Sequence, residues 1–223
     1  MISPTNYTID LTKLQEAKEE LPTVDFKLAL NQPTGDFFYE PWEIKTEFQG
    51  TVWDDILQSL GQNIGEARLI KLEPGTCYHS HSDIDNRWHL TIEAKQAYLV
   101  DITSKKIYTC VDDGVWYDMN AGTLHSATNF GNTDRVQLVV RQLLPKNELE
   151  ESVNVIVTLK QYRPDFRYIF DNTLSPWLNF QANNAKILTN FKNENNIVSF
   201  DIDPKAIDNL KALLDPIFEV KVA

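Results

Sequence analysis

Residues 67–141 read ARLIKLEPGTCYHSHSDIDNRWHLTIEAKQAYLVDITSKKIYTCVDDGVWYDMNAGTLHSATNFGNTDRVQLVVR, and this stretch decides the fold. It alternates short segments rich in β-branched and aromatic residues with tight-turn signals. The turn signals are Glu73-Pro74-Gly75, Asp112-Asp113-Gly114, Asn120-Ala121-Gly122 and Gly131-Asn132. Around them we predict strands at residues 67–72, 87–93, 97–102, 107–111, 115–119, 123–129 and 136–144. Because no helical pattern separates these strands, the sequence predicts a mainly β fold, an antiparallel double sheet or jelly roll.

The segments on either side of this stretch predict flanking helices and a second, smaller domain. Helices are predicted at residues 6–20 and 53–60, where apolar residues recur at helical spacing. After Pro145 the composition shifts to a polar linker. Beyond it we predict a strand at 153–159, an asparagine-rich hairpin at 184–202, a helix at 203–214 and a strand at 218–222. The prediction is therefore a β domain with N-terminal helices over residues 1–149 and a small α+β appendage over residues 150–223.

Composition and charge exclude several classes of protein. Hydrophobic residues make up 42% and charged residues 24% of the 223 residues, as in ordinary globular proteins. A net charge of -11 opposes binding to nucleic acid or to anionic lipid, both of which require a basic surface. Cys77 and Cys110 are expected to be reduced thiols. With no apolar signal segment and no apolar run of about 18 residues, we expect a soluble cytoplasmic protein with no membrane partner.

All four histidines of the chain, His79, His81, His89 and His125, lie within residues 78–141. Neutral imidazole and carboxylate are good ligands for ferrous iron. His81 and Asp83 are two residues apart, so on an extended strand both side chains would point to one face. With His125 from another strand they would form the 2-His-1-carboxylate triad of non-haem Fe(II) oxygenases. A bare His-x-Asp occurs by chance in many proteins, and a register in which His79 replaces His81 stays open.

Arg135 strengthens the prediction of an iron site. It lies ten residues beyond His125, just after the turn at residues 131–134. A guanidinium on the strand next to the distal ligand can bind a carboxylate through two hydrogen bonds. An iron triad with one buried arginine is typical of a site for a keto acid co-substrate.

These residues resemble the Fe(II)- and 2-oxoglutarate-dependent oxygenases of the aspartyl/asparaginyl β-hydroxylase type, whose relatives include proline hydroxylases. The resemblance covers about residues 67–141 and rests on three blocks in order: ARLIKLEPGTCYHSHSD, NRWHLTI and VWYDMNAGTLHSATNFGNTDRVQLVV. They are similar to the family's His-x-Asp entry, its Arg-x-His-Leu strand and its block of His, Asn-x-Gly and Arg. The fold implied by the resemblance is a cupin-like double-stranded β-helix.

The resemblance also implies roles for individual residues. His81, Asp83 and His125 would bind Fe(II) and form the catalytic centre. Arg135 would hold the distal carboxylate of 2-oxoglutarate. Arg87 and His89 match the family's Arg-x-His, which helps to seat the co-substrate.

Some residues depart from the family pattern or have a simpler interpretation. Gln137 and Arg141 stand where relatives often carry His and Asp, which leaves the substrate open, and the match does not reach residues 150–223. His89 is equally well read as a structural strand histidine, and Arg87 as a solvated strand end. Asp118 is expected to stabilise a turn, and Trp88 and Trp116 are expected in the core.

The predicted function is hydroxylation of a C–H bond of a small polar substrate, an amino acid or a peptide side chain, using Fe(II), 2-oxoglutarate and molecular oxygen. Arg68 and Arg141 are candidates for meeting a substrate carboxylate, or are surface strand residues. The first alternative is a cupin-like module that binds a metal or small ligand without turnover. A cupin isomerase or hydrolase, which would not need Arg135, is the second. Homodimerisation stays open.

Overall fold

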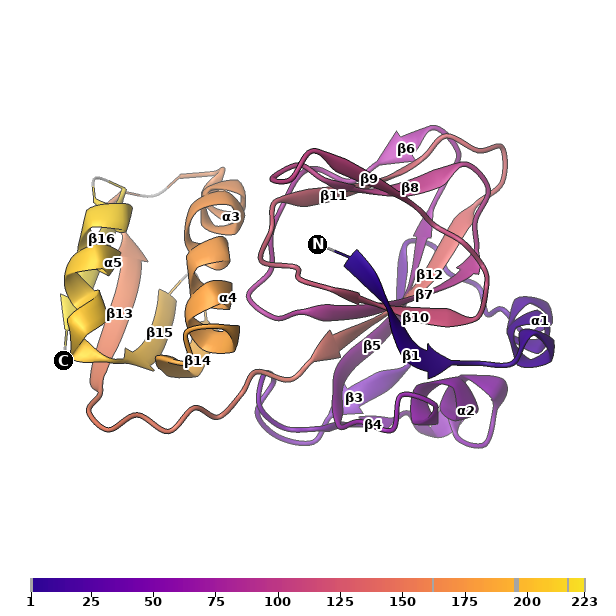
Figure 1. The fold of residues 1–223 in the computed structure, drawn as a ribbon, viewed down its shortest axis with the longest axis horizontal. Helices are drawn as coiled ribbons and strands as arrows, with labels where there is room; N and C mark the ends of the chain where they lie inside the picture. Colours follow the sequence, from indigo (N-terminus) through magenta and orange to yellow (C-terminus); the bar gives the residue numbers. More distant parts are fainter. Residues whose placement is uncertain (1, 162, 195–196, 216, 223) are drawn as a thin grey trace. The chain divides into compact units, whose positions relative to one another are not determined.

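The computed structural model describes residues 2–161, 163–194, 197–215 and 217–222. The chain divides into two compact units (Figure 1). The first comprises Met1–Ser80 and Asp85–Leu143, and the second comprises His81–Ile84 and Leu144–Ala223. The second unit thus begins six residues before the predicted position 150, and it takes in a short segment from the middle of the predicted β domain.

The first unit contains two antiparallel sheets that face each other (Figure 1). The larger has the order β1 (Ile2–Thr8), β10 (Val115–Met119), β7 (Arg87–Glu93), β12 (Arg135–Gln142), β5 (Ile64–Leu72) and β2 (Lys27–Ala29). The smaller has the order β6 (Thr76–Cys77), β11 (His125–Asn129), β8 (Ala97–Asp101) and β9 (Lys106–Thr109). A separate pair joins β3 (Asn31–Pro33) to β4 (Trp42–Ile44). The predicted mainly β class is confirmed: this is a cupin-like jelly roll with flanking helices.

The central strand β12 is buried on both faces, and its two faces differ in chemistry. Val136, Leu138 and Val140 join an apolar core that includes Trp53 and Ile56 of the helix α2 (Val52–Gln58). Because side chains alternate along a strand, Arg135, Gln137, Val139 and Arg141 share the opposite face. That face is the interior of the jelly roll, since the Arg135 side chain reaches Cys110 just after β9. The interior is therefore partly polar, whereas the helix-covered face is apolar.

The N-terminal segment differs from the prediction of one helix over residues 6–20. Residues 2–8 form strand β1, which pairs antiparallel with β10, and the helix α1 runs only over Leu11–Glu19. Asp10 caps this helix, because its carboxylate accepts a hydrogen bond from the Thr12 N–H at 2.7 Å. Leu14 and Ala17 are buried as their spacing predicts. The predicted helix is too long because nothing in the local sequence shows that residues 2–8 pair with the distant strand β10. Asp10 marks the point where the extended segment ends and the helix begins.

The second unit has a four-stranded antiparallel sheet in the order β14 (Leu188–Glu194), β15 (Ile197–Ile202), β13 (Val153–Leu159) and β16 (Phe218–Val222). Val198, Phe200 and Ile202 are buried and alternate with more exposed residues, so one face of the sheet is covered. The predicted hairpin corresponds to β14 and β15, and its residues 195–196 lie outside the described residues. The remaining helices are listed in chain order: η1 (Thr46–Phe48) in the first unit, and α3 (Phe166–Ile169), the π-helix η2 (Phe170–Leu174), α4 (Ser175–Asn183), η3 (Pro204–Ala206) and α5 (Ile207–Leu214) in the second.

Within the described ranges, no helix combines the length and the apolar character needed to cross a membrane.

Candidate metal centre

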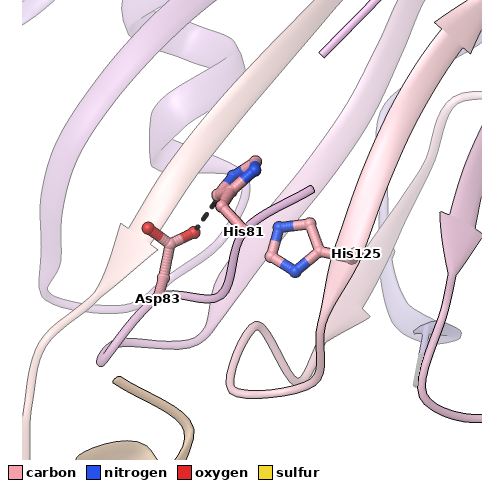
Figure 2. A group of neighbouring side chains, drawn as sticks. All are labelled: His81, Asp83 and His125. Carbon is pink, nitrogen blue, oxygen red and sulfur yellow. Dashed lines mark ion pairs between the residues drawn. The ribbon is translucent and has the colours of Figure 1, made fainter. Parts of the chain in front are cut away.

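Three predicted metal ligands come together in the structure. His81, Asp83 and His125 each offer one ligand atom, and these atoms all lie within 4.8 Å of one another. Figure 2 shows the three side chains, with His81 Nε2 and Asp83 Oδ2 3.9 Å apart. Two imidazoles and one carboxylate are a donor set that suits Fe(II). His79 is exposed and is not a member of this group.

His81 and Asp83 are not presented by a strand, contrary to the prediction from their spacing. They lie in the connection between β6 and β7, where His81 makes an isolated bridge and Asp83 has no regular secondary structure. Between them Ser82 is buried, with 1% of its surface exposed. The two ligands therefore project from a loop, and the alternation of side chains along a strand does not explain why they lie on the same side.

His125 begins strand β11 and has a defined tautomer. Its Nδ1 lies 2.7 Å from the carbonyl oxygen of Thr123, and a carbonyl oxygen can only accept a hydrogen bond. Nδ1 therefore carries the hydrogen, and Nε2 keeps its lone pair for a metal. This backbone contact fixes both the ring orientation and the ligand atom of His125.

Arg135 is the first residue of β12 and has 2% of its surface exposed. It donates from Nη2 to Oε1 of Gln137, and its Nε lies 3.5 Å from Sγ of Cys110. The predicted neighbourhood of Arg135 needs correction, because β12 belongs to the larger sheet and β11 to the smaller one. The guanidinium is thus buried in the interior of the jelly roll, where a carboxylate would bind it without competition from bulk water.

His89 belongs to the same interior network. Its Nδ1 lies 3.0 Å from Oε1 of Gln137, and Nε2 of Gln137 donates to Oγ1 of Thr91 at 3.1 Å. Because Arg135 can only donate, the oxygen of Gln137 must face it, and His89 carries its hydrogen on Nδ1. Burial, aided by the positive charge of Arg135, lowers the pKa of His89 from 6.5 to about 3. The ring is therefore neutral at physiological pH.

The other ring nitrogen of His89 points to a place for a bound group. Nε2 is buried, and no hydrogen-bond partner for it occurs among the residues that the structure describes. A buried polar atom usually has a partner, so an orphan of this kind fits a ligand that would occupy the interior. The buried guanidinium of Arg135 fits the carboxylate of a keto acid, whereas Nε2 of the neutral His89 can only accept and would need a donor, such as a hydroxyl or a water.

Arg87 and Arg141 are engaged by one buried carboxylate. Asp85 has 1% of its surface exposed; it accepts from Nε and Nη2 of Arg141 at 2.6 and 2.9 Å, and Nη2 of Arg87 lies 3.2 Å away. The Arg141 guanidinium also lies 4.5 Å from the ring centroid of Phe37 and 5.2 Å from that of Phe38. Arg87 has 3% of its surface exposed, so its interpretation as a solvated strand end is wrong.

Several residues around the site were missed or misassigned from the sequence. Gln137 was noted only as a departure from a family pattern, and no role was predicted for Asp85, which is two residues beyond Asp83. Continuing the same two-residue spacing would have singled out Asp85. Asp118, expected to stabilise a turn, lies in strand β10 instead, and its carboxylate accepts a hydrogen bond from Nε2 of Gln142 at 2.5 Å. Trp116 is fully buried in the core and Trp88 packs against it, as expected.

Comparisons with known proteins concern the fold. No protein-family model matches the chain, and no curated protein matches it. An oxidoreductase of the 2OG-Fe(II) oxygenase family from Burkholderia pseudomallei is similar at a TM-score of 0.47 and 12% identity, over 63% of this chain and 83% of that one. A prolyl-4-hydroxylase from Pseudomonas putida is similar at 0.38 and 14%, over 63% and 90%. A cupin domain from Bordetella pertussis Tohama I is similar at 0.32 and 11%, over 54% and 96%. At these identities the likeness is one of fold alone.

Proposed function

We propose that this protein is an Fe(II)- and 2-oxoglutarate-dependent dioxygenase that hydroxylates a C–H bond of a small polar substrate, an amino acid or a peptide side chain. The observation that carries the proposal is the meeting of the ligand atoms of His81, Asp83 and His125 within 4.8 Å of one another. The buried guanidinium of Arg135 supports the choice of co-substrate, because a metal site alone would suit many cupin-like proteins.

His81, Asp83 and His125 would hold the iron through two imidazole nitrogens and one carboxylate oxygen. Bound there with its keto acid co-substrate, Fe(II) supplies the oxygen chemistry that can attack an unactivated C–H bond. The protein orients the ligands. Thr123 holds the His125 ring so that Nε2 is the ligand atom, which removes rotational freedom from that ligand before metal binds.

Arg135 would bind the distal carboxylate of 2-oxoglutarate. Its side chain is already held by Gln137 and lies beside Cys110, so little conformational entropy would be lost when a carboxylate binds. His89 would lie beside the co-substrate, where its neutral ring can only accept a hydrogen bond at Nε2. Arg87 would act less directly than the resemblance implies, because its guanidinium contacts Asp85.

The substrate class is the less constrained part of the proposal. Arg68 is paired with Glu66, and Arg141 with Asp85, so neither is assigned the role of binding a substrate carboxylate. A small polar substrate remains the proposal because the interior of the jelly roll carries polar and charged side chains.

The test is succinate formation from 2-oxoglutarate with Fe(II) and oxygen, measured across a panel of free amino acids and short peptides. Calorimetric titration of 2-oxoglutarate into the Mn(II)-loaded protein measures co-substrate binding without turnover, with Arg135→Ala as the variant and Arg163→Ala as an exposed control. We expect binding by the wild-type protein and the control, and its loss in Arg135→Ala. Binding without succinate for any substrate would favour a module without turnover. If neither metal nor 2-oxoglutarate binds, the proposal is wrong.

A further inference from the structure

The segment that carries two of the candidate ligands belongs to the second compact unit. Residues 81–84 group with residues 144–223, although Ser80 and Asp85 on either side group with the first unit. Because the segment is an irregular loop rather than part of a ladder, inter-strand hydrogen bonds do not hold it in place along its length. Loops of this kind need other partners to be rigid.

The first partner is a backbone carbonyl that the helix itself does not satisfy. The hydroxyl of Ser82 donates to the carbonyl oxygen of Asp171 in the π-helix η2. The N–H of Ser175 donates instead to Phe170, and Pro176, the next possible donor, has no N–H. The π-helical turn followed by proline therefore leaves the Asp171 carbonyl available for Ser82.

The second and third partners are two asparagines one turn apart on α4. Nδ2 of Asn179 donates to the carbonyl oxygen of Asp83, and Nδ2 of Asn183 donates to that of Ile84, both at 3.2 Å. Residues four apart lie on the same face of a helix, so both amides face the segment. Asn183 also donates to the backbone carbonyl oxygen of Asn179 at 3.1 Å, which holds its amide on the surface of α4. Asn179 has only 2% of its surface exposed.

Three consecutive residues, Ser82, Asp83 and Ile84, are thus each held by a group from residues 171–183. We propose that these groups are the positioning device for the metal ligands His81 and Asp83, with Asn179 as the principal positioning residue. The proposal rests on the proposed function in so far as His81 and Asp83 bind a metal. It gives the C-terminal unit a role: its helices set the backbone from which two ligands project.

The test compares Asn179→Asp with Asn172→Asp in the full-length protein. Asn179→Asp keeps the size of the side chain but replaces the amide donor by an acceptor facing the Asp83 carbonyl. Asn172 is the matched control, because its Nδ2 also donates to a carbonyl, that of Tyr168, in a solvent-exposed hydrogen bond whose acceptor is outside residues 81–84. Each variant is titrated with Co(II), whose absorption spectrum reports the ligand geometry, and its melting temperature is recorded.

Metal-free samples are examined in parallel by hydrogen–deuterium exchange of the peptide containing residues 81–85. We expect Asn179→Asp to bind Co(II) about tenfold or more weakly, with an altered spectrum and faster exchange of that peptide. Asn172→Asp is expected to match the wild type in all three. Equal affinity and equal exchange in Asn179→Asp and the wild type would overturn the proposal.

Two further outcomes are distinguishable. If the wild-type protein binds no metal, the proposed function fails, and the exchange of residues 81–85 still decides whether Asn179 holds the segment. If Asn179→Asp is too unstable to compare, Ser82→Ala removes the donor to Asp171 while leaving α4 unchanged. Ser82→Ala is expected to show the same weaker metal binding and faster exchange, and wild-type values in that variant would overturn the proposal.

Discussion

The side-chain oxygen of Gln137 lies 3.0 Å from Nδ1 of His89 and also accepts a hydrogen bond from Arg135. One amide oxygen therefore determines the tautomer of the histidine and the orientation of the arginine. The amide nitrogen of Gln137 donates to Thr91, so the side chain cannot turn over without losing all three contacts. Gln137 is itself neutral, so it orients Arg135 without compensating the positive charge of the guanidinium.

Replacing Gln137 by Glu is expected to weaken 2-oxoglutarate binding. The introduced carboxylate would pair with Arg135 and compete with the co-substrate for the guanidinium. A hydrogen bond to a charged group contributes roughly 1.5–3 kcal/mol, so we expect a loss in affinity of about tenfold or more. Titration calorimetry with Mn(II)-loaded protein measures it. Gln49→Glu, which makes the same charge change at an exposed position, is the control, and an unchanged affinity in Gln137→Glu would contradict the role of Arg135.

The lowered pKa of His89 predicts how the stability of the folded protein depends on pH. Its pKa is lowered in the folded protein from 6.5 to about 3, so between these values the unfolded chain binds more protons than the folded one. The contribution of His89 is therefore complete above pH 6.5 and is lost as the pH falls from 6.5 towards 3, by at most about 1.4 kcal/mol per pH unit. Urea unfolding of wild-type protein and His89→Gln between pH 7.5 and 4.5 tests this. We expect the variant to lose less stability on acidification, and parallel curves would refute the assignment.

Asp85 is expected to be important for stability, because its carboxylate is shared by two largely buried arginines. Asp85→Asn would leave Arg87 and Arg141 without this counter-charge. Removing one partner of a buried ion pair typically costs about 3–5 kcal/mol. Urea unfolding measures the change, with Asp165→Asn as the control, since Asp165 pairs with Arg163 on the surface. If the free energy of unfolding fell no more in Asp85→Asn than in the control, the two arginines would have found other partners.

Metal binding should discriminate between His79 and His81. A metal that binds only the folded protein raises its stability, by about 2.7 kcal/mol at a free concentration one hundred times the dissociation constant. We expect Co(II) to raise the melting temperature of the wild type and of His79→Ala, and to have little effect on His81→Ala or His125→Ala. Chelation of the metal should reverse the increase. The register with His79 as ligand would be supported if His79→Ala lost the response and His81→Ala kept it.

Local chemistry made the strands of the jelly roll readable from the sequence. Strands at residues 87–93 and 115–119 of the jelly roll, and at residues 153–159 of the second unit, have the predicted ends, because alternation and turn residues act over a few positions. The segment at residues 2–8 was missed because its partner, β10, lies more than a hundred residues away in sequence. Similarly, no local pattern could show that β11 and β12, which follow each other in the chain, belong to different sheets.

The sequence by itself determined the mainly β class and the identity of the candidate ligands, because residue type and short spacing are local properties. Only the tertiary structure decided that His81 and Asp83 project from a loop, that Gln137 orients Arg135 and His89, and that Asp85 holds two arginines. The hydrogen bonds that hold residues 81–84 also join residues far apart in the chain: Asn179 and Asp83 are separated by 96 positions in the sequence. Contacts of that kind depend on how whole elements pack, and packing depends on the sum of many side chains rather than on any short motif.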